Sequence, residues 1–184
     1  RKLPISQVLD YGILSGGGLY VATSFVPGEN WTAMVDGIDS VEARLILAKR
    51  LCETIEYMHH HEFYHGDLHP ENIIFRDAEI DGVGELDRNL ILIDVLDFGT
   101  ESDPYNTSYG PTNPTVTDDF GRDRFAVYTI IRELFPEDCP KALAEELERA
   151  NNQRDHIPVS LAPLRESLNS CLTPEPEHEQ EAAI

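Results

Sequence analysis

The chain has few cysteines, few basic residues and no long apolar run, and each shortage excludes a class of protein. Its apolar runs are only a few residues long, whereas a membrane-spanning helix needs about 20 apolar residues. The three cysteines are far apart and odd in number, which fits neither a disulfide framework nor a zinc site: Cys52, Cys139 and Cys171. We therefore expect no membrane partner and a reducing compartment, the cytoplasm.

Basic residues are outnumbered by acidic ones, 14 to 34, which gives a net charge of −20. Such a chain repels phosphate backbones, so we expect no nucleic-acid partner and a preference for cationic ones. Its 184 residues, 41% of them apolar, suit one globular domain or one lobe of a larger domain. The chain begins with Arg1 and no signal-peptide pattern follows, so we expect a piece of a longer polypeptide.

Short strands and long helices are both predicted by the residue pattern. Two strands, at 5–12 and 19–24, flank a turn at Gly16–Gly18. Residues 29–39 are a loop or a short helix. Apolar residues recur at helical spacing over 40–60, with Ser40 as the N-cap.

The second half of the chain predicts more helices. Short strands are expected at 73–75 and 90–95, and helices at 123–135, 138–151 and 160–171. The polar segments 76–89 and 100–119 are predicted to be an acidic hairpin tip and an irregular loop. The histidines at 59–61 are predicted to form a solvated helix end, because three consecutive residues cannot converge on one metal ion.

Three polar motifs adjoin these short strands and the 123–135 helix. They are His65-x-Asp67-x4-Asn72, then Asp97-Phe98-Gly99, then Asp123 at the head of the helix. In this order and context they resemble the eukaryotic-like protein kinase superfamily, over roughly residues 5 to 135. The resemblance implies an α+β fold, mainly helical, like the large C-terminal lobe of a protein kinase with short β-hairpins.

The resemblance implies roles for the polar residues. Asp67 matches the catalytic base, and His69 stands where Ser/Thr kinases have a lysine, so both are catalytic candidates. Asn72 and Asp97 match the ligands of Mg2+, a cation that prefers oxygen ligands. Phosphoryl transfer from ATP needs these parts, because the acceptor must be oriented and the triphosphate charge neutralised.

Two further groups of residues are implied by the resemblance. In Leu19–Gly28, Thr23 falls at the gatekeeper position, and the Ser24 carbonyl and Val26 amide fall where the family binds the adenine edge. The residues expected to hold the catalytic groups in place are His65, Phe98, Gly99 and Asp123.

Three segments follow from this resemblance. Residues 1–28 are predicted to be the last small-lobe strands and the hinge, 29–172 the kinase-like C-lobe, and 173–184 a disordered acidic tail. The family's glycine-rich strands, ATP-binding lysine and pairing glutamate would precede residue 5, and this chain lacks them. We therefore expect it to be inactive or nearly so alone, with the remainder of the kinase polypeptide as a partner.

Three functions remain open from the sequence. The first is the catalytic lobe of a Ser/Thr protein kinase that acts on a protein substrate. The second is a small-molecule kinase of the aminoglycoside or choline type acting on a cationic acceptor, which His69 and the short segment from Gly99 to Asp123 favour. The third is a non-catalytic kinase-like interaction module. Gly66 stands where the family commonly has an arginine, which argues against the usual phosphorylation switch.

Overall fold

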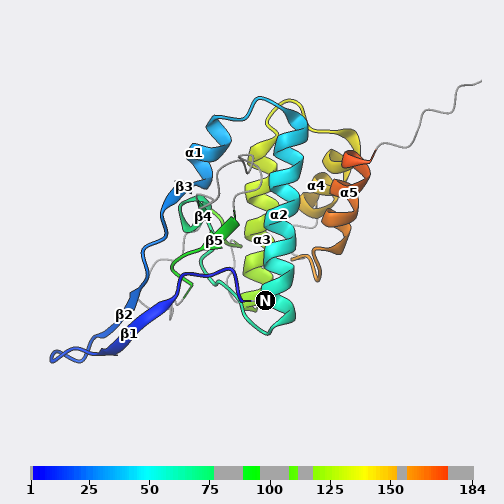
Figure 1. The fold of residues 1–184 in the computed structure, drawn as a ribbon. Coiled ribbons are helices and arrows are strands. Elements are labelled where there is room, and N and C mark those ends of the chain that lie inside the picture. The colour runs from blue at the N-terminus through cyan, green and yellow to red at the C-terminus, as the bar shows by residue number, and fades with distance from the viewer. Residues whose placement is uncertain (1, 77–88, 96–107, 112–117, 153–156, 174–184) are drawn as a thin grey trace, which may run out of the picture.

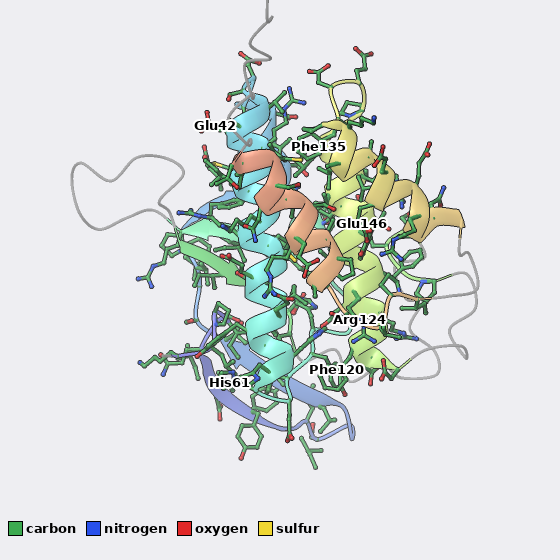
Figure 2. The ribbon with its side chains drawn as sticks, turned by 90° about the vertical axis from the view of Figure 1, so that its right-hand side faces the viewer. Glu42, His61, Phe120, Arg124, Phe135 and Glu146 are labelled. Atoms are coloured by element: carbon green, nitrogen blue, oxygen red, sulfur yellow. The ribbon has the colours of Figure 1, made fainter. Side chains whose placement is uncertain are left out.

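The computed structural model describes residues 2–76, 89–95, 108–111, 118–152 and 157–173. Two long helices, α2 (Val41–His60) and α3 (Asp119–Leu134), lie side by side at its centre. Figure 2 shows that they are antiparallel, since Glu42 and Phe135 lie at one end of the pair and His61 and Phe120 at the other. None of the helices in the described ranges is long and apolar enough to cross a membrane.

Helix α2 forms the middle of the core. Ser40 caps it as predicted, since its hydroxyl accepts a hydrogen bond from the Ala43 N–H. Buried positions recur along α2 in adjacent pairs, at Leu47 with Ala48 and at Leu51 with Cys52. A helix buried at adjacent positions has neighbours on more than one side. Those neighbours are α3, α5 and the strand β5.

Two further helices cover α2 and α3 on one side. Helices α4 (Lys141–Asn152) and α5 (Ala162–Leu172) pack against each other, and α5 also packs against α2. Arg44 near the start of α2 donates to the Leu134 carbonyl at the end of α3. The helices predicted at 138–151 and 160–171 are confirmed, and each observed boundary lies within three residues of the predicted one.

A small antiparallel sheet covers another side of the helix pair (Figure 1). Its strand order is β3 (Gly28–Asn30), β4 (Ile73–Arg76), β5 (Asn89–Leu92). Helix α1 (Trp31–Asp36) follows β3 directly, and Trp31 stacks on Phe75 with ring centroids 5.7 Å apart. The sequence pattern missed β3, because a three-residue strand of Gly, Glu and Asn has no apolar alternation to reveal it.

Gly28 explains how so short a strand pairs with β4. Its φ is +144°, and a Cβ atom there would overlap the backbone carbonyl of Phe75. Any side chain at this position would push the two strands apart. The Pro27-Gly28 pair therefore ends the preceding extended segment and permits β3 to pair with β4.

The first two strands form a separate hairpin, β1 (Val8–Ile13) with β2 (Leu19–Thr23). The hairpin projects away from the helices (Figure 1). Gly17 lies in its turn with φ +85°, which confirms the predicted turn at Gly16–Gly18. Residues before β1 hold its base to the sheet, since Ser6 N–H donates to the Leu92 carbonyl over 2.9 Å.

The sequence expectation about the start of the third long helix was wrong. Helix α3 begins at Asp119 with Asp118 as its N-cap, four residues before the predicted start. Asp123 is therefore inside the helix and not at its head. Residues 77–88 of the expected acidic hairpin tip, most of the expected irregular loop and residues 174–184 of the expected tail lie outside the described residues.

Candidate active site

The loop between α2 and β4 is attached to helix α3 through Asp123. The carboxylate of Asp123 is fully buried. Its Oδ2 accepts from the His65 N–H over 2.7 Å, and its Oδ1 accepts from the Gly66 N–H over 2.9 Å. The role expected of Asp123 was to brace this loop, and these two bonds do so across more than fifty residues of sequence.

A third group at Asp123 comes from the end of α2. The His59 ring nitrogen Nε2 lies 3.0 Å from Asp123 Oδ2. The same ring makes an edge contact with Phe120, at 5.0 Å between centroids. The prediction that all three histidines at 59–61 are solvated is therefore wrong for His59. Adjacent helical residues point in different directions, so one of the three faces α3 while His60 and His61 stay exposed.

His65 connects the loop to the strand β5. Its Nδ1 accepts from the Asp67 N–H over 3.3 Å, and its Nε2 lies 2.9 Å from the Ile93 carbonyl. A ring that accepts at Nδ1 and donates at Nε2 is a neutral imidazole. Burial lowers the pKa of His65, with the Asp123 carboxylate opposing that effect. A neutral ring therefore holds this junction at physiological pH.

Asp67 and Asn72 are joined directly. The Asn72 amide group donates through Nδ2 to the Asp67 backbone carbonyl over 3.0 Å. The Asn72 side chain is nearly buried, and the residue lies in the short 3-10 helix η1 (Pro70–Asn72). Because its NH2 group is used on that carbonyl, the amide oxygen is the Asn72 atom suited to bind a cation. The Asp67 carboxylate is 28% exposed, which leaves it accessible.

His69 lies beside the Asp67 carboxylate, with 3.6 Å between Nε2 and Oδ2. Tyr109 lies beyond His69, with 6.4 Å between the two ring centroids. The Tyr109 hydroxyl donates to the exposed Glu133 on α3 over 2.9 Å, and burial together with this bond raises the pKa of Tyr109 to about 12. Asp67, His69 and Tyr109 thus form a row that includes two of the predicted site residues and one that sequence reasoning missed.

Gly66 suits its position because the backbone there is left-handed. Its φ is +88°, a left-handed conformation that glycine adopts without strain. Its N–H is at the same time held by Asp123. The residue between His65 and Asp67 is therefore a glycine suited to the path that the loop takes here.

The predicted adenine-binding residues lie where β2 leads towards β3. Thr23 ends β2 and is exposed. The Ser24 N–H and hydroxyl are bonded to the Gln7 backbone, at 2.7 Å and 3.0 Å. In the described part of the chain, the Ser24 carbonyl and the Val26 N–H have no backbone partner. These two groups are the ones expected to bind an adenine edge.

Three predicted site residues lie outside the described residues: Asp97, Phe98 and Gly99. Asp94 is described and lies two residues after the end of β5, with φ +59°. Within the described ranges, no group of three His, Cys, Asp or Glu side chains is arranged to hold a metal ion.

An open depression of about 580 Å³ lies next to His59, which is among the residues that line it. Helices α2, α3 and α5 contribute to its lining, which includes Glu53, Tyr57, Arg124 and Arg165. None of the predicted catalytic, metal or adenine-binding residues lines it. Glu56 and Arg165 on its wall form an ion pair at 2.7 Å, which indicates a packing contact between α2 and α5.

Three solved structures similar to this chain are variants of one kinase domain. A single mutant of the PknI kinase domain from Mycobacterium tuberculosis matches with a TM-score of 0.63 and 20% identity, covering 92% of this chain and 72% of that one. A double mutant of that domain gives 0.62 and 20% with the same coverage. The chain has a protein-kinase-like fold. A second double mutant gives 0.55 and 19%, covering 92% and 71%.

This kinase-like fold confirms the α+β, mainly helical class that the motifs implied. No protein-family model matches the chain, and no curated protein sequence matches it. At 20% identity the likeness concerns the fold, so the chemistry has to be argued from the residues described above.

Proposed function

We propose that this chain is the catalytic lobe of an ATP-dependent phosphotransferase, most closely a Ser/Thr protein kinase. The observation that carries the proposal is the joint fixing of Asp67 and Asn72. Asn72 is bonded to the Asp67 carbonyl, and the loop between them is attached to α3 through Asp123 and to β5 through His65. Catalytic groups held by buried partners are preorganised for a reaction.

In this proposal Asp67 accepts the proton of the acceptor hydroxyl. Its carboxylate is accessible, and its backbone is held at both the N–H and the carbonyl. A base must lie within hydrogen-bond reach of the proton that it removes. His69, 3.6 Å away, would stand beside the acceptor, in the position where Ser/Thr kinases have a lysine.

ATP and Mg2+ are the proposed cofactors. The Asn72 amide oxygen and a carboxylate that follows β5 fit a hard cation, which takes oxygen ligands. When bound, the cation would neutralise charge on the phosphate groups. The Ser24 carbonyl and the Val26 N–H would bind the adenine edge, beside Thr23.

The acceptor in this proposal is cationic, a basic protein segment or a small molecule. Glu71 and Glu133 are exposed around the row formed by Asp67, His69 and Tyr109. In the described part of the chain, neither glutamate has a basic partner. This acidic surface also suits the small-molecule alternative, so the choice of acceptor is part of the test.

The test measures transfer of labelled γ-phosphate in the natural full-length protein that contains this chain. Asp67→Asn should reduce transfer by about 10²-fold or more, since general base catalysis contributes about 10² to 10⁴. Asp138→Asn is the matched control, because Asp138 is exposed and pairs with Arg44 near the start of α2, at the end away from the loop.

Acceptors of three kinds are compared: the protein itself, basic peptides and amino-alcohols. Transfer to protein that disappears in Asp67→Asn supports a protein kinase. Transfer to amino-alcohols alone supports a small-molecule kinase. Equal transfer by the wild-type protein and Asp67→Asn contradicts the proposal and favours a non-catalytic kinase-like module.

A further inference from the structure

Tyr109 is attached to the core through its hydroxyl group. The hydroxyl donates to Glu133 Oε2 over 2.9 Å, and Glu133 lies in the last turn of α3. Asp123, which accepts from the His65 and Gly66 N–H groups, lies earlier on the same helix, about 15 Å along its axis. One helix therefore holds both the proposed catalytic loop and Tyr109.

The Tyr109 ring lies beside the His69 ring. Their centroids are 6.4 Å apart and their planes differ by 31°. Tyr109 is partly buried against the hydrophobic core, and close packing limits how far a ring can move there. The His69 side chain is itself only 15% exposed. Tyr109 therefore bounds the space that is available to the imidazole.

A second neighbour of the His69 ring is the Asp67 carboxylate. The 3.6 Å between His69 Nε2 and Asp67 Oδ2 is too long for a hydrogen bond. The His69 backbone is held, since its carbonyl accepts from the Asn72 N–H over 3.0 Å. In the described part of the chain, however, no hydrogen bond fixes the ring. Its orientation therefore depends on packing, and Tyr109 is its described aromatic neighbour.

Orientation matters more for an imidazole than for the lysine that Ser/Thr kinases have at this position. An imidazole presents its two nitrogens only in the plane of a short, flat ring, whereas an ammonium group on a flexible chain has three rotatable donors. Turning the His69 ring would move its nitrogens away from Asp67. A misplacement of about 1 Å at a reacting centre can cost about 10²-fold in rate.

We infer that Tyr109 is a positioning residue whose ring holds the His69 imidazole beside the Asp67 carboxylate. Glu133 anchors the Tyr109 hydroxyl on α3. This inference rests on the proposed function. The sequence motifs do not reveal Tyr109, because it belongs to none of them and only tertiary contacts bring it to His69. Supporting residues of this kind decide whether a site is held closely enough to act.

The test is a double-mutant cycle in the natural full-length protein, with transfer of labelled γ-phosphate from ATP as the readout. Tyr109→Ala is made in the wild-type protein and in His69→Lys, which replaces the imidazole by a flexible ammonium group. Tyr109→Phe keeps the ring and loses only the bond to Glu133. Tyr11→Ala is the matched control, because that tyrosine is 76% exposed on the hairpin. Urea denaturation checks that each variant is folded.

We expect Tyr109→Ala to lower kcat by about tenfold and to leave the KM for ATP within about twofold, because the ring acts on the proton-accepting groups and not on the nucleotide. Tyr109→Phe should lose less than about threefold, since only one exposed hydrogen bond is removed. In His69→Lys, Tyr109→Ala should alter kcat by less than about twofold, because no imidazole is left to orient. Equal losses in the two backgrounds would mean that Tyr109 is merely structural and would overturn the inference.

A second readout does not depend on activity. It is the motion of the His69 ring, measured by NMR relaxation of its Cε1–Hε1 group. Tyr109→Ala should increase this motion, whereas Tyr109→Phe and Tyr11→Ala should not. Unchanged ring motion or an undiminished kcat in Tyr109→Ala would overturn the inference while leaving the proposed function standing. Equal transfer by the wild-type protein and Asp67→Asn would defeat the proposed function itself, and the inference with it.

Discussion

The proposed catalytic loop, between α2 and β4, and the β1–β2 hairpin are stabilised in opposite ways. The proposed catalytic loop is attached to residues distant in sequence, since Asp123 accepts from the His65 and Gly66 N–H groups and the His65 ring is bonded to the Ile93 carbonyl. The hairpin is held mainly by its own ladder, and it exposes Tyr11 at 76% and Ile13 at 73%. The loop has an irregular backbone but is firmly bonded to the rest of the molecule. The hairpin has regular secondary structure but few bonds to the rest of the described chain.

This difference shows that secondary structure is a poor measure of how firmly a segment is fixed. A two-stranded hairpin is at best marginally stable in water unless a third strand or a helix packs against it. A loop whose N–H groups are bonded to a buried carboxylate is held by strong, charge-assisted bonds. The proposed catalytic groups lie on the firmly attached region, and the proposed adenine-binding groups follow the weakly attached one.

The largest expected contrast is between two isoleucines. Ile55 on α2 is fully buried, whereas Ile13 on β1 is 73% exposed. Ile55→Ala should lower the free energy of unfolding by about 2–5 kcal/mol, because it leaves a cavity in the core. Ile13→Ala should change it by less than about 0.5 kcal/mol. Urea denaturation measures both, and equal losses would show that the hairpin is packed as tightly as the core.

The second contrast is between two aspartates. Asp123→Asn should cost about 2–4 kcal/mol, because an NH2 group would replace an oxygen that accepts from buried N–H donors. Asp10→Asn, which removes the charge from the acceptor of the exposed Tyr20 hydroxyl, should cost less than about 1 kcal/mol. The measurement is the midpoint of urea denaturation, which reports stability when the slope of the unfolding free energy against urea concentration is unchanged. A stable Asp123→Asn variant would contradict the role of Asp123 in holding the loop.

A third contrast separates two glycines of the N-terminal region. Gly28→Ala should cost about 2 kcal/mol or more, because its Cβ would overlap the Phe75 carbonyl and its φ is +144°. Gly16→Ala should be nearly neutral, since no atom lies within 4 Å of a Cβ there. Thermal unfolding of the two variants gives the comparison. A neutral Gly28→Ala would mean that β3 does not pair with β4 as described.

The smallest effect concerns two neighbouring histidines. His59→Ala should cost about 1–2 kcal/mol, because it removes the ring that lies 3.0 Å from Asp123. His60→Ala should stay within about 0.5 kcal/mol, because His60 is exposed. Hydrogen exchange at the His65 and Gly66 amides sharpens the test, since His59→Ala should increase it. Equal unfolding free energies and equal amide exchange in the two variants would mean that His59 is as solvated as His60, as the sequence pattern predicted.

Much of this fold follows from the local pattern. Apolar spacing over 40–60 and the Ser40 cap predicted α2, and alternation around three glycines predicted the β1–β2 hairpin. Local pattern failed for β3, whose pairing depends on Gly28 fitting against Phe75. It failed also at the start of α3, where Asp118 is the cap and Asp123 is buried one turn later.

The sequence by itself determined which residue types are available for the proposed phosphoryl transfer, because Asp67, Asn72 and Asp123 occur in motifs whose order can be read along the chain. Tertiary structure alone decided which groups meet. His59 faces Asp123 because α2 and α3 are antiparallel, and Ile93 bonds to Asn72 because β4 and β5 pair in one register. The reason is physical: a motif specifies side-chain chemistry, whereas helix packing and strand register determine which distant backbone groups lie within hydrogen-bond distance.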